Sequence, residues 1–261
     1  MSPDPQQFSF GQNSYLEIKD EESALTPQPK TVSVSLSSIL TKSGPLPREA
    51  LFLGVASDGL PVLLNLHDPI PGPLLVTGEA GSGKTAFLQS VVRALIQSHQ
   101  PSDLQYGVVT SRPDEWNEIT NTDHRAGVFF VTDKGTHGLV RSMATWAHEN
   151  KNSRQSVLLI VDDLEAIAKL DLDALQNFRW LLARGPSRRV WPIVTMDAER
   201  YGQVLAWIPL FRSRIFGCIK NEQAGNALGG DKLSALYTLE APNQFSLREN
   251  DSWVRFRLPG E

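Results

Sequence analysis

Hydrophobic positions follow two periods along most of this chain, and each change of period marks a change of element. Short apolar runs bounded by turn residues indicate strands, and apolar residues three and four positions apart indicate helices. The strands expected after residue 70 are PLLVT (73–77), LQYGVVT (104–110), AGVFFVT (126–132), VLLIV (157–161), VWPIVT (190–195) and RIFGCI (214–219). The expected helices are 84–99, 137–150, about 173–183 and 200–208. Strands separated by helices predict an α/β fold with a mostly parallel sheet and helices on both faces.

A β-hairpin is expected at each end of this α/β pattern. LFLGV (51–55) and PVLLNL (61–66) are joined through Asp58–Gly59, a strong turn signal, and predict the N-terminal β-hairpin. The tail FSLRENDSWVRFRL (245–258) predicts a C-terminal β-hairpin that turns at Glu249–Ser252.

The first 45 residues differ in composition from the rest. Residues 1–45 are rich in Pro, Ser, Gln and acidic residues, which is typical of a loosely ordered extension. Within this extension, KTVSVSLSSIL (30–40) alternates well enough to predict one short strand. We therefore expect one α/β domain over residues 46–261.

The segment GEAGSGKT has the spacing G-x-x-x-x-G-K-[ST] of a phosphate-binding loop, or P-loop. Glycines let backbone N–H groups curl around a phosphate anion, and the following helix adds its N-terminal dipole. Lys84 would reach the β- and γ-phosphates of ATP, and the Thr85 hydroxyl would complete the shell of Mg²⁺. An ordinary glycine-rich turn is the alternative, but the preceding apolar strand and following amphipathic helix favour the loop. The predicted nucleotide-binding residues are Gly78, Glu79, Ala80, Gly81, Ser82, Gly83, Lys84 and Thr85.

Two acidic residues follow the apolar run VLLIV (157–161). Asp162 stands at the carboxyl edge of that strand, where open α/β sheets bind ligands, and is the second predicted Mg²⁺ ligand. Asp163 is the candidate for orienting the water that attacks the γ-phosphate. Both residues could instead only cap the next helix, but the upstream phosphate loop favours the metal site.

Composition narrows the function classes. The chain has 261 residues, is 41% hydrophobic, and has no apolar run long enough to span a membrane. No secretory signal is visible, and the single cysteine, Cys218, fits a buried residue in a reducing compartment, so we expect a cytoplasmic location. A net charge of −4 argues against coating nucleic acid by bulk electrostatics.

Arginines are nevertheless concentrated in one part of the chain. Between Phe178 and Ile215 only two acidic residues, Asp197 and Glu199, accompany seven arginines: Arg179, Arg184, Arg188, Arg189, Arg200, Arg212 and Arg214. They form either a solvated helix face or a surface that contacts phosphate, on a neighbour's nucleotide or on DNA.

Five segments, in order, resemble the motor domain of FtsK/SpoIIIE DNA translocases. The resemblance covers roughly residues 45–261 and extends to HerA-type motors, conjugative coupling proteins and type VII secretion ATPases. The segments are GVASDGLPVLLNLHDPIPGPLLVTGEAGSGKT, VFFVTDKGTHGLVRSMATWAHEN, VLLIVDDLEAI, LLARGPSRRVWPIVT and FRSRIFGCIKNEQAGNALGGDKLSALY.

The resemblance implies a RecA-like P-loop NTPase domain that assembles into a ring with ATP between subunits. It implies that Arg184 and Arg188, with Arg214 as a further candidate, complete the site of a neighbouring subunit. Two positions differ from the family pattern: Asp163 replaces its glutamate, and Met196 replaces a glutamine that senses the γ-phosphate. The sequence also shows no transmembrane part, no C-terminal winged-helix module and a shortened insertion before VLLIV, so we expect a reduced ATPase core.

Two functions follow from these observations. The first is an ATP-binding and ATP-hydrolysing motor that acts on double-stranded DNA or a translocated protein, as a homo- or hetero-oligomeric ring or a ring component and without a membrane partner. The alternative is a non-catalytic nucleotide-binding subunit or switch that assembles a partner complex. Asp163 and Met196 favour the alternative, whereas Lys84, Asp162 and the arginines favour the motor. A small-molecule kinase is disfavoured because the sequence shows no basic lid pattern.

Overall fold

The computed structural model describes residues 34–119, 122–150, 154–232, 234–249 and 252–260. The chain divides into two units, residues 1–32 and 33–261, and the fold below is that of the second unit. Most of the predicted N-terminal extension therefore lies outside the described residues.

The described residues form one ten-stranded sheet with the order β2-β1-β10-β9-β8-β3-β7-β6-β4-β5. The six strands from β8 to β5 run parallel, and the other four extend the sheet in antiparallel fashion. The predicted α/β class with a mostly parallel sheet is confirmed. The strands are β1 (Ala50–Ala56), β2 (Pro61–Asn65), β3 (Leu74–Gly78), β4 (Leu104–Thr110), β5 (Arg125–Phe130), β6 (Ser156–Asp162), β7 (Val190–Asp197), β8 (Ser213–Phe216), β9 (Gln244–Glu249) and β10 (Ser252–Arg257).

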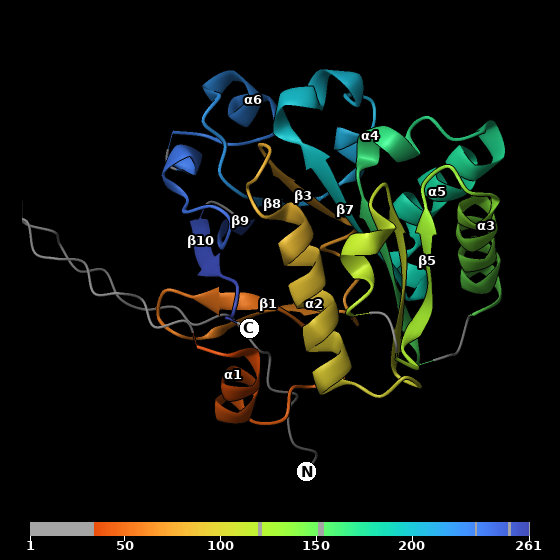
Figure 1. Ribbon diagram of the computed structural model, residues 1–261, viewed down its shortest axis with the longest axis horizontal. Helices are drawn as coiled ribbons and strands as arrows, with labels where there is room; N and C mark the ends of the chain where they lie inside the picture. Colours follow the sequence, from red (N-terminus) through yellow and green to blue (C-terminus); the bar gives the residue numbers. More distant parts are fainter. Residues whose placement is uncertain (1–33, 120–121, 151–153, 233, 250–251, 261) are drawn as a thin grey trace, which may run out of the picture. The chain divides into compact units, whose positions relative to one another are not determined.

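Helices follow most of the parallel strands (Figure 1). The α-helices are α1 (Leu36–Ser43), α2 (Lys84–Ser98), α3 (Lys134–Glu149), α4 (Leu164–Ile167), α5 (Leu172–Arg184) and α6 (Glu222–Ala227). The 3₁₀ segments are η1 (Pro113–Trp116), η2 (Pro186–Arg188), η3 (Ala198–Gln203), η4 (Ile208–Leu210) and η5 (Leu236–Thr238).

The central strand β6 shows why helices are needed on both faces. All of its residues are buried. Leu158 and Ile160 pack in the hydrophobic cluster that contains α2, whereas Val157, Leu159 and Val161 pack in the cluster that contains α3 and α5. Successive strand residues point to opposite faces, so a continuous apolar run requires cover on both sides.

The two predicted hairpins are confirmed, and they also pair with each other. β1 pairs with β2, and β9 pairs with β10. In addition β10 pairs with β1, with Val55 opposite Arg257, so the two ends of the domain share one sheet. The ring of Phe87 in α2 lies 5.3 Å from that of Phe245 and 6.3 Å from that of Phe256, which anchors the closing hairpin on α2.

The short strand expected within residues 30–40 is wrong, because the described part of that segment is mainly helix α1. Ser35 accepts a hydrogen bond from the backbone N–H of Ser38 and caps the helix. Leu36 and Ile39 are three positions apart and pack with residues of β1 and α2. The alternation that suggested a strand therefore gives way to a capped amphipathic turn.

The single helix expected at 200–208 is also wrong, since this segment contains η3 and the start of η4. Asp197 caps η3 by accepting a hydrogen bond from the N–H of Glu199. Pro209 disfavours an α-helical conformation in the residue before it, which limits helix growth across this region.

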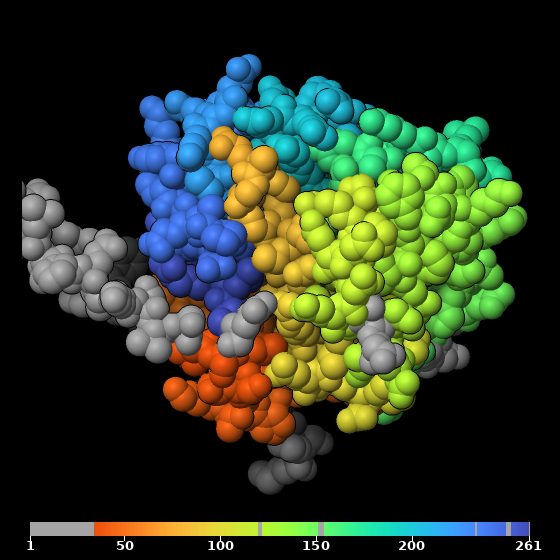
Figure 2. All heavy atoms as spheres, viewed as in Figure 1, coloured from red at the N-terminus to blue at the C-terminus, as the bar shows by residue number. Residues whose placement is uncertain are grey.

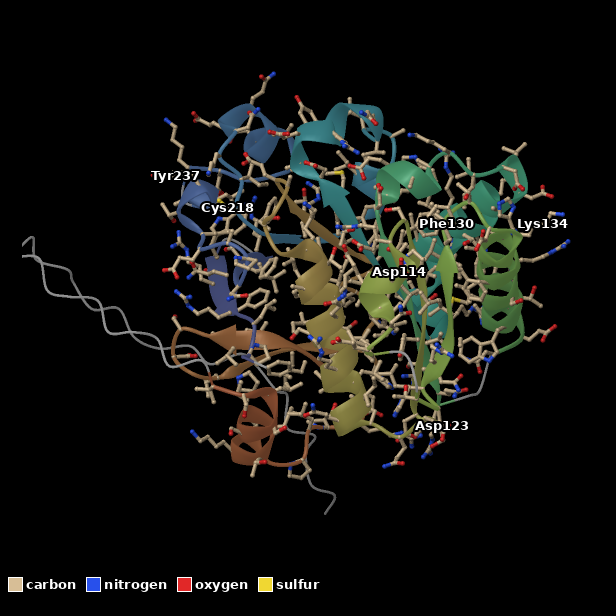
Figure 3. The ribbon with its side chains drawn as sticks, viewed as in Figure 1. Asp114, Asp123, Phe130, Lys134, Cys218 and Tyr237 are labelled. Carbon is tan, nitrogen blue, oxygen red and sulfur yellow. The ribbon has the colours of Figure 1, made fainter. Side chains whose placement is uncertain are left out.

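Cys218 is buried, as expected, and its Sγ lies 3.9 Å from the carbonyl oxygen of Tyr237 (Figure 3). In the part of the chain that the structure describes, no helix is both long and apolar enough to cross a membrane.

Candidate nucleotide-binding site

The predicted phosphate loop curls between β3 and α2 at the carboxyl end of the sheet. β3 ends at Gly78 and α2 begins at Lys84, so the expected order of strand, loop and helix is confirmed. Gly83 has φ of +90°, and a Cβ at this position would lie 1.8 Å from the carbonyl oxygen of Pro242. Only glycine fits here, because both the backbone angle and the close approach of a second chain segment exclude a side chain.

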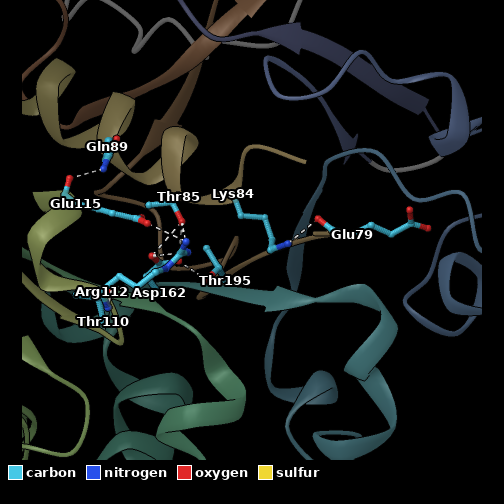
Figure 4. Close-up of polar contacts among 9 residues, drawn as sticks. All are labelled: Glu79, Lys84, Thr85, Gln89, Thr110, Arg112, Glu115, Asp162 and Thr195. Carbon is cyan, nitrogen blue, oxygen red and sulfur yellow. Dashed lines mark hydrogen bonds and ion pairs between the residues drawn. The ribbon is translucent and has the colours of Figure 1, made fainter. Parts of the chain in front are cut away.

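The Lys84 side chain folds back over the loop. Its Nζ donates hydrogen bonds of 2.8 Å to the carbonyl oxygens of Gly78 and Glu79. Figure 4 shows the bond to Glu79. Burial lowers the pKa of Lys84, and the nearby carboxylates of Asp197 and Glu165 act in the opposite direction. The ammonium group is thus held beside the loop by weak neutral acceptors, which an incoming phosphate could replace.

The Thr85 hydroxyl and the Asp162 carboxylate lie together. Thr85 Oγ1 donates to Asp162, at 3.3 Å from Oδ1 and 3.1 Å from Oδ2. Thr195 Oγ1 in β7 donates to Asp162 Oδ1 at 2.9 Å and fixes the carboxylate from the other side. Hydroxyl and carboxylate oxygens are the hard ligands that Mg²⁺ prefers. The donor set therefore fits a magnesium ion that takes its remaining ligands from phosphate and water.

These residues line one cavity of about 450 Å³. Figure 2 shows the gold segment that includes α2 at the surface, between blue C-terminal residues and yellow-green residues that follow β4. The predicted binding residues on the cavity wall are Ala80, Gly81, Gly83, Lys84 and Thr85. Glu79 instead accepts hydrogen bonds from the N–H groups of Lys220 and Asn221 with Oε1, at 2.6 and 2.8 Å. Its side chain thereby joins the loop to the segment before α6.

Asp163 lines the same cavity but already has a structural partner. Its Oδ1 accepts a hydrogen bond of 3.1 Å from the N–H of Ala166, so it caps α4. Its backbone has φ of +117° and ψ of +88°, which is rare for a residue with a side chain. Strained residues are concentrated at functional sites, so capping and water positioning both fit the geometry.

Further cavity residues were not predicted from the sequence. They are Ser111, Arg112, Glu115, Glu165, Thr195 and Asp197; Arg200, from the arginine-rich segment, also lines the cavity. Most of them lie at or just after the carboxyl ends of β4, β6 and β7, where ligands of α/β sheets bind, so position alone could have identified them.

Glu165 has a buried carboxyl group with a strongly shifted pKa. Its Oε1 accepts a hydrogen bond of 2.9 Å from the N–H of Asp197, and the residue is only 5% exposed. Burial, together with the Asp163 side chain, raises the pKa of Glu165 to about 7. The cavity thus holds a carboxyl group that is partly protonated near neutral pH.

Arg184 and Arg188 do not line this cavity. They lie at the end of α5 and in η2, just before β7 begins, whereas the phosphate loop lies at the opposite end of the sheet, where Gly78 pairs with Asp197. Arg184 lines a separate cavity of about 380 Å³. Within one chain, the structure does not bring either arginine to the phosphate loop.

The structure also shows where the side chains of Arg214, considered for a neighbour's site, and Met196, at the sensing position, lie. Arg214 Nη1 donates to the carbonyl oxygen of Leu228 at 2.7 Å, within its own chain. Met196 is fully buried in β7 beside Thr77 and contributes to the cavity wall. Its thioether offers no strong hydrogen bond to a phosphate.

Comparisons with known families and solved structures identify proteins that are similar to this chain. The NACHT domain model matches residues 72–189, which include the phosphate loop, Asp162 and Asp163. No curated protein matches the chain by sequence.

Several solved structures are similar over most of the chain. The cytoplasmic domain of the type VII secretion ATPase EccC from Thermomonospora curvata has a TM-score of 0.66 and 17% identity, and the match covers 87% of this chain and 28% of that one. EssC (ATPases 2 and 3) from Geobacillus thermodenitrificans has a TM-score of 0.69 and 13% identity over 91% and 48%.

The pCW3 conjugation coupling protein TcpA, in a monomer form with ATPγS, is also similar. Its TM-score is 0.58 at 13% identity, over 81% of this chain and 66% of that one. This chain thus spans about a quarter of the EccC structure and half of the EssC structure that it matches. At these identities the similarity concerns the fold, so the chain has the RecA-like P-loop NTPase fold found in these secretion and conjugation proteins.

Proposed function

We propose that this protein binds ATP with Mg²⁺ in the cavity at the phosphate loop. The observation that carries the proposal is the convergence of three groups at the carboxyl end of the sheet. These are the Lys84 ammonium on the loop and the Thr85 hydroxyl hydrogen-bonded to the Asp162 carboxylate. Lys84 would neutralise the β- and γ-phosphates, and Thr85 and Asp162 would hold the ion, Asp162 through water.

We further propose that the bound ATP is hydrolysed in an FtsK/HerA-type motor. Asp163 would orient the attacking water, and Arg184 and Arg188 would reach the nucleotide of a neighbouring subunit in a ring. Their position outside their own chain's cavity supports a role between subunits. The fold shared with a secretion ATPase and a conjugation coupling protein supports a translocated polymer, either protein or DNA.

A non-catalytic nucleotide switch is the second candidate. One observation favours it: the Asp163 carboxylate already caps α4 through Ala166. In that case ATP would hold the phosphate loop in one conformation, and the Glu79 link to Lys220 and Asn221 would transmit that conformation to the segment before α6.

The binding proposal is tested with Lys84→Ala and a matched control. Lys84→Ala should abolish ATP binding in calorimetry with Mg²⁺ present while the thermal unfolding midpoint stays close to wild type, because the ammonium group lies on the loop and not in the core. Lys134→Ala, at the exposed start of α3, removes the same charge elsewhere and should leave binding unchanged. Wild-type affinity in Lys84→Ala would contradict the site.

The motor and the switch are separated by ATP turnover, measured with and without duplex DNA. The motor predicts turnover that DNA or an added partner protein changes. The switch predicts tight binding of ATP and no turnover under any of these conditions.

A further inference from the structure

The guanidinium group of Arg112 lies beside the proposed magnesium ligands. Its Nη2 donates a hydrogen bond of 3.2 Å to Thr85 Oγ1 and lies 4.0 Å from Asp162 Oδ2 (Figure 4). Arg112 was not among the residues that the sequence indicated. It lies two residues after the end of β4 and immediately before η1.

This position of Arg112 is supported by several contacts. Its Nη1 forms an ion pair of 2.8 Å with Glu115 Oε1, and its backbone N–H donates to Thr110 Oγ1 at 3.0 Å. Gln89 in α2 donates to the carbonyl oxygen of Glu115 at 2.8 Å, and Trp116 is fully buried in the core. The loop is therefore tied to α2 and to the sheet on both sides of the guanidinium group.

The hydroxyl of Thr85 has a limited number of partners. It donates its proton to Asp162 and accepts from Arg112. A magnesium ion would need an oxygen lone pair of the same hydroxyl. The oxygen has two lone pairs, but a guanidinium group and a divalent cation held side by side on it repel each other, so binding of one disfavours binding of the other.

We infer that Arg112 takes the place of the magnesium ion beside Thr85 and Asp162 in the nucleotide-free chain, and that Mg²⁺ bound with nucleotide displaces it. This inference rests on the proposed binding of Mg²⁺ and ATP. Arg112 is a positioning residue: it keeps the carboxylate of Asp162 partly neutralised and the Thr85 hydroxyl oriented while the site is empty. Its displacement loosens the contacts to Glu115 and so couples magnesium binding to the loop after β4.

The inference is tested by the magnesium dependence of nucleotide affinity. ATP binding is measured by calorimetry with Mg²⁺ and again with a chelator, for wild type, Arg112→Ala and Arg200→Ala. Arg200 lines the same cavity and carries the same charge, but it is not one of the residues found on Thr85 or Asp162, so it is the matched control.

Loss of a positive charge alone should weaken binding of an anionic nucleotide in both variants. Removing the group that competes with Mg²⁺ should lower the Kd for ATP only in Arg112→Ala, and only when Mg²⁺ is present. We expect the ratio of Kd without Mg²⁺ to Kd with Mg²⁺ to rise by up to about fivefold in Arg112→Ala, the size expected for removing an exposed charged contact. The same ratio should be unchanged in Arg200→Ala.

Two outcomes would overturn the inference. An unchanged or lowered ratio in Arg112→Ala would mean that Arg112 binds phosphate or serves only the loop. Equal rises in Arg112→Ala and Arg200→Ala would mean that cavity charge, and not the place of Arg112, sets the magnesium dependence. Arg112→Lys keeps the charge but cannot contact Glu115 and the Thr85 hydroxyl through two separate nitrogens, so it should give an intermediate ratio.

The failure of the proposed function looks different. If wild type and Lys84→Ala bind ATP equally, or neither binds it, the nucleotide site itself is refuted. A normal Lys84 effect with a flat Arg112 ratio refutes only the role of Arg112. The Arg112 side chain is 59% exposed, so its variants should fold, which unfolding midpoints within about 2 °C of wild type would confirm.

Discussion

Substitutions at Asp163 separate helix capping from water positioning. Asp163→Asn keeps an oxygen that can accept from the N–H of Ala166, and asparagine tolerates positive φ better than most residues. It removes the negative charge that a water-orienting carboxylate needs. Asp163→Ala removes both the charge and the cap. Asp163→Gly removes the charge and the side-chain hydrogen bond, but glycine is still tolerated at the N-cap and relaxes the backbone.

The expected stability changes follow from the cap and from the backbone angle. Asp163→Asn should change the free energy of unfolding by less than about 0.5 kcal/mol, since asparagine and aspartate are similar caps. Asp163→Ala should lose about 1 kcal/mol with the cap. Asp163→Gly should gain about 1 kcal/mol, because a strained φ in a residue with a side chain costs on the order of 1–3 kcal/mol and glycine caps nearly as well.

Urea unfolding and phosphate release from Mg²⁺·ATP measure the two properties on the same samples. A catalytic Asp163 predicts that Asp163→Asn has wild-type stability and no turnover, and that Asp163→Glu, with its longer side chain, turns over faster than wild type. A misplacement of about 1 Å can cost on the order of 100-fold in rate. The turnover of Asp163→Glu can therefore exceed that of wild type by up to about this factor. Full turnover in Asp163→Asn would refute the catalytic role and leave only the cap.

Three further outcomes are expected. Gly83→Ala should destabilise the fold by at least about 2 kcal/mol in urea unfolding, because its Cβ would lie 1.8 Å from the backbone oxygen of Pro242; a neutral result would show that the Pro242 segment moves freely. The carboxyl of Glu165 has a pKa raised to about 7 from 4.5, so its contribution to stability is lost as pH rises through that interval. Glu165→Gln should then lose less stability than wild type between about pH 5 and about pH 8, and parallel pH profiles would contradict the raised pKa. The double variant of Arg184 and Arg188 to alanine should bind ATP as a monomer but lose ATP-dependent self-association in sedimentation, and unchanged association would remove both arginines from an interface.

Local sequence patterns were sufficient for the elements that position the site. The buried strand before Asp162 and the amphipathic helix after Lys84 are each specified by residues within one segment. The carboxyl edge of a parallel sheet then brings Thr85 and Asp162 together, although they are 77 residues apart. The fold rule, and not any single motif, made that contact predictable.

Contacts that depend on tertiary packing were not predictable in the same way. Helix α1 is stabilised because Leu36 and Ile39 pack against Phe52 and Ala94. No local sequence pattern reveals these contacts. The place of Arg112 likewise depends on Glu115 and on a loop tied to α2. A local pattern cannot specify a partner that the fold brings from another element.

The charges of the cavity indicate why nucleotide binding should depend steeply on magnesium. Its acidic residues are Glu115, Asp162, Asp163, Glu165 and Asp197, and its basic residues are Lys84, Arg112 and Arg200. Five carboxylates against three cations leave a formal charge of −2 around a ligand that is itself a polyanion. Partial protonation of Glu165 removes some of this charge, but most of it must be offset by the metal.

An empty site of this kind carries a cost of its own, because Asp162 is buried and would repel the neighbouring carboxylates. Arg112 offsets this repulsion from the rim, where it remains exposed enough to leave. A buried lysine in its place would be held too tightly to be displaced, and a neutral side chain would leave Lys84 to offset the charge of Asp162 without help from the rim. The arrangement therefore suits a site that must alternate between an empty state and a magnesium-bound state, as both the motor and the switch require.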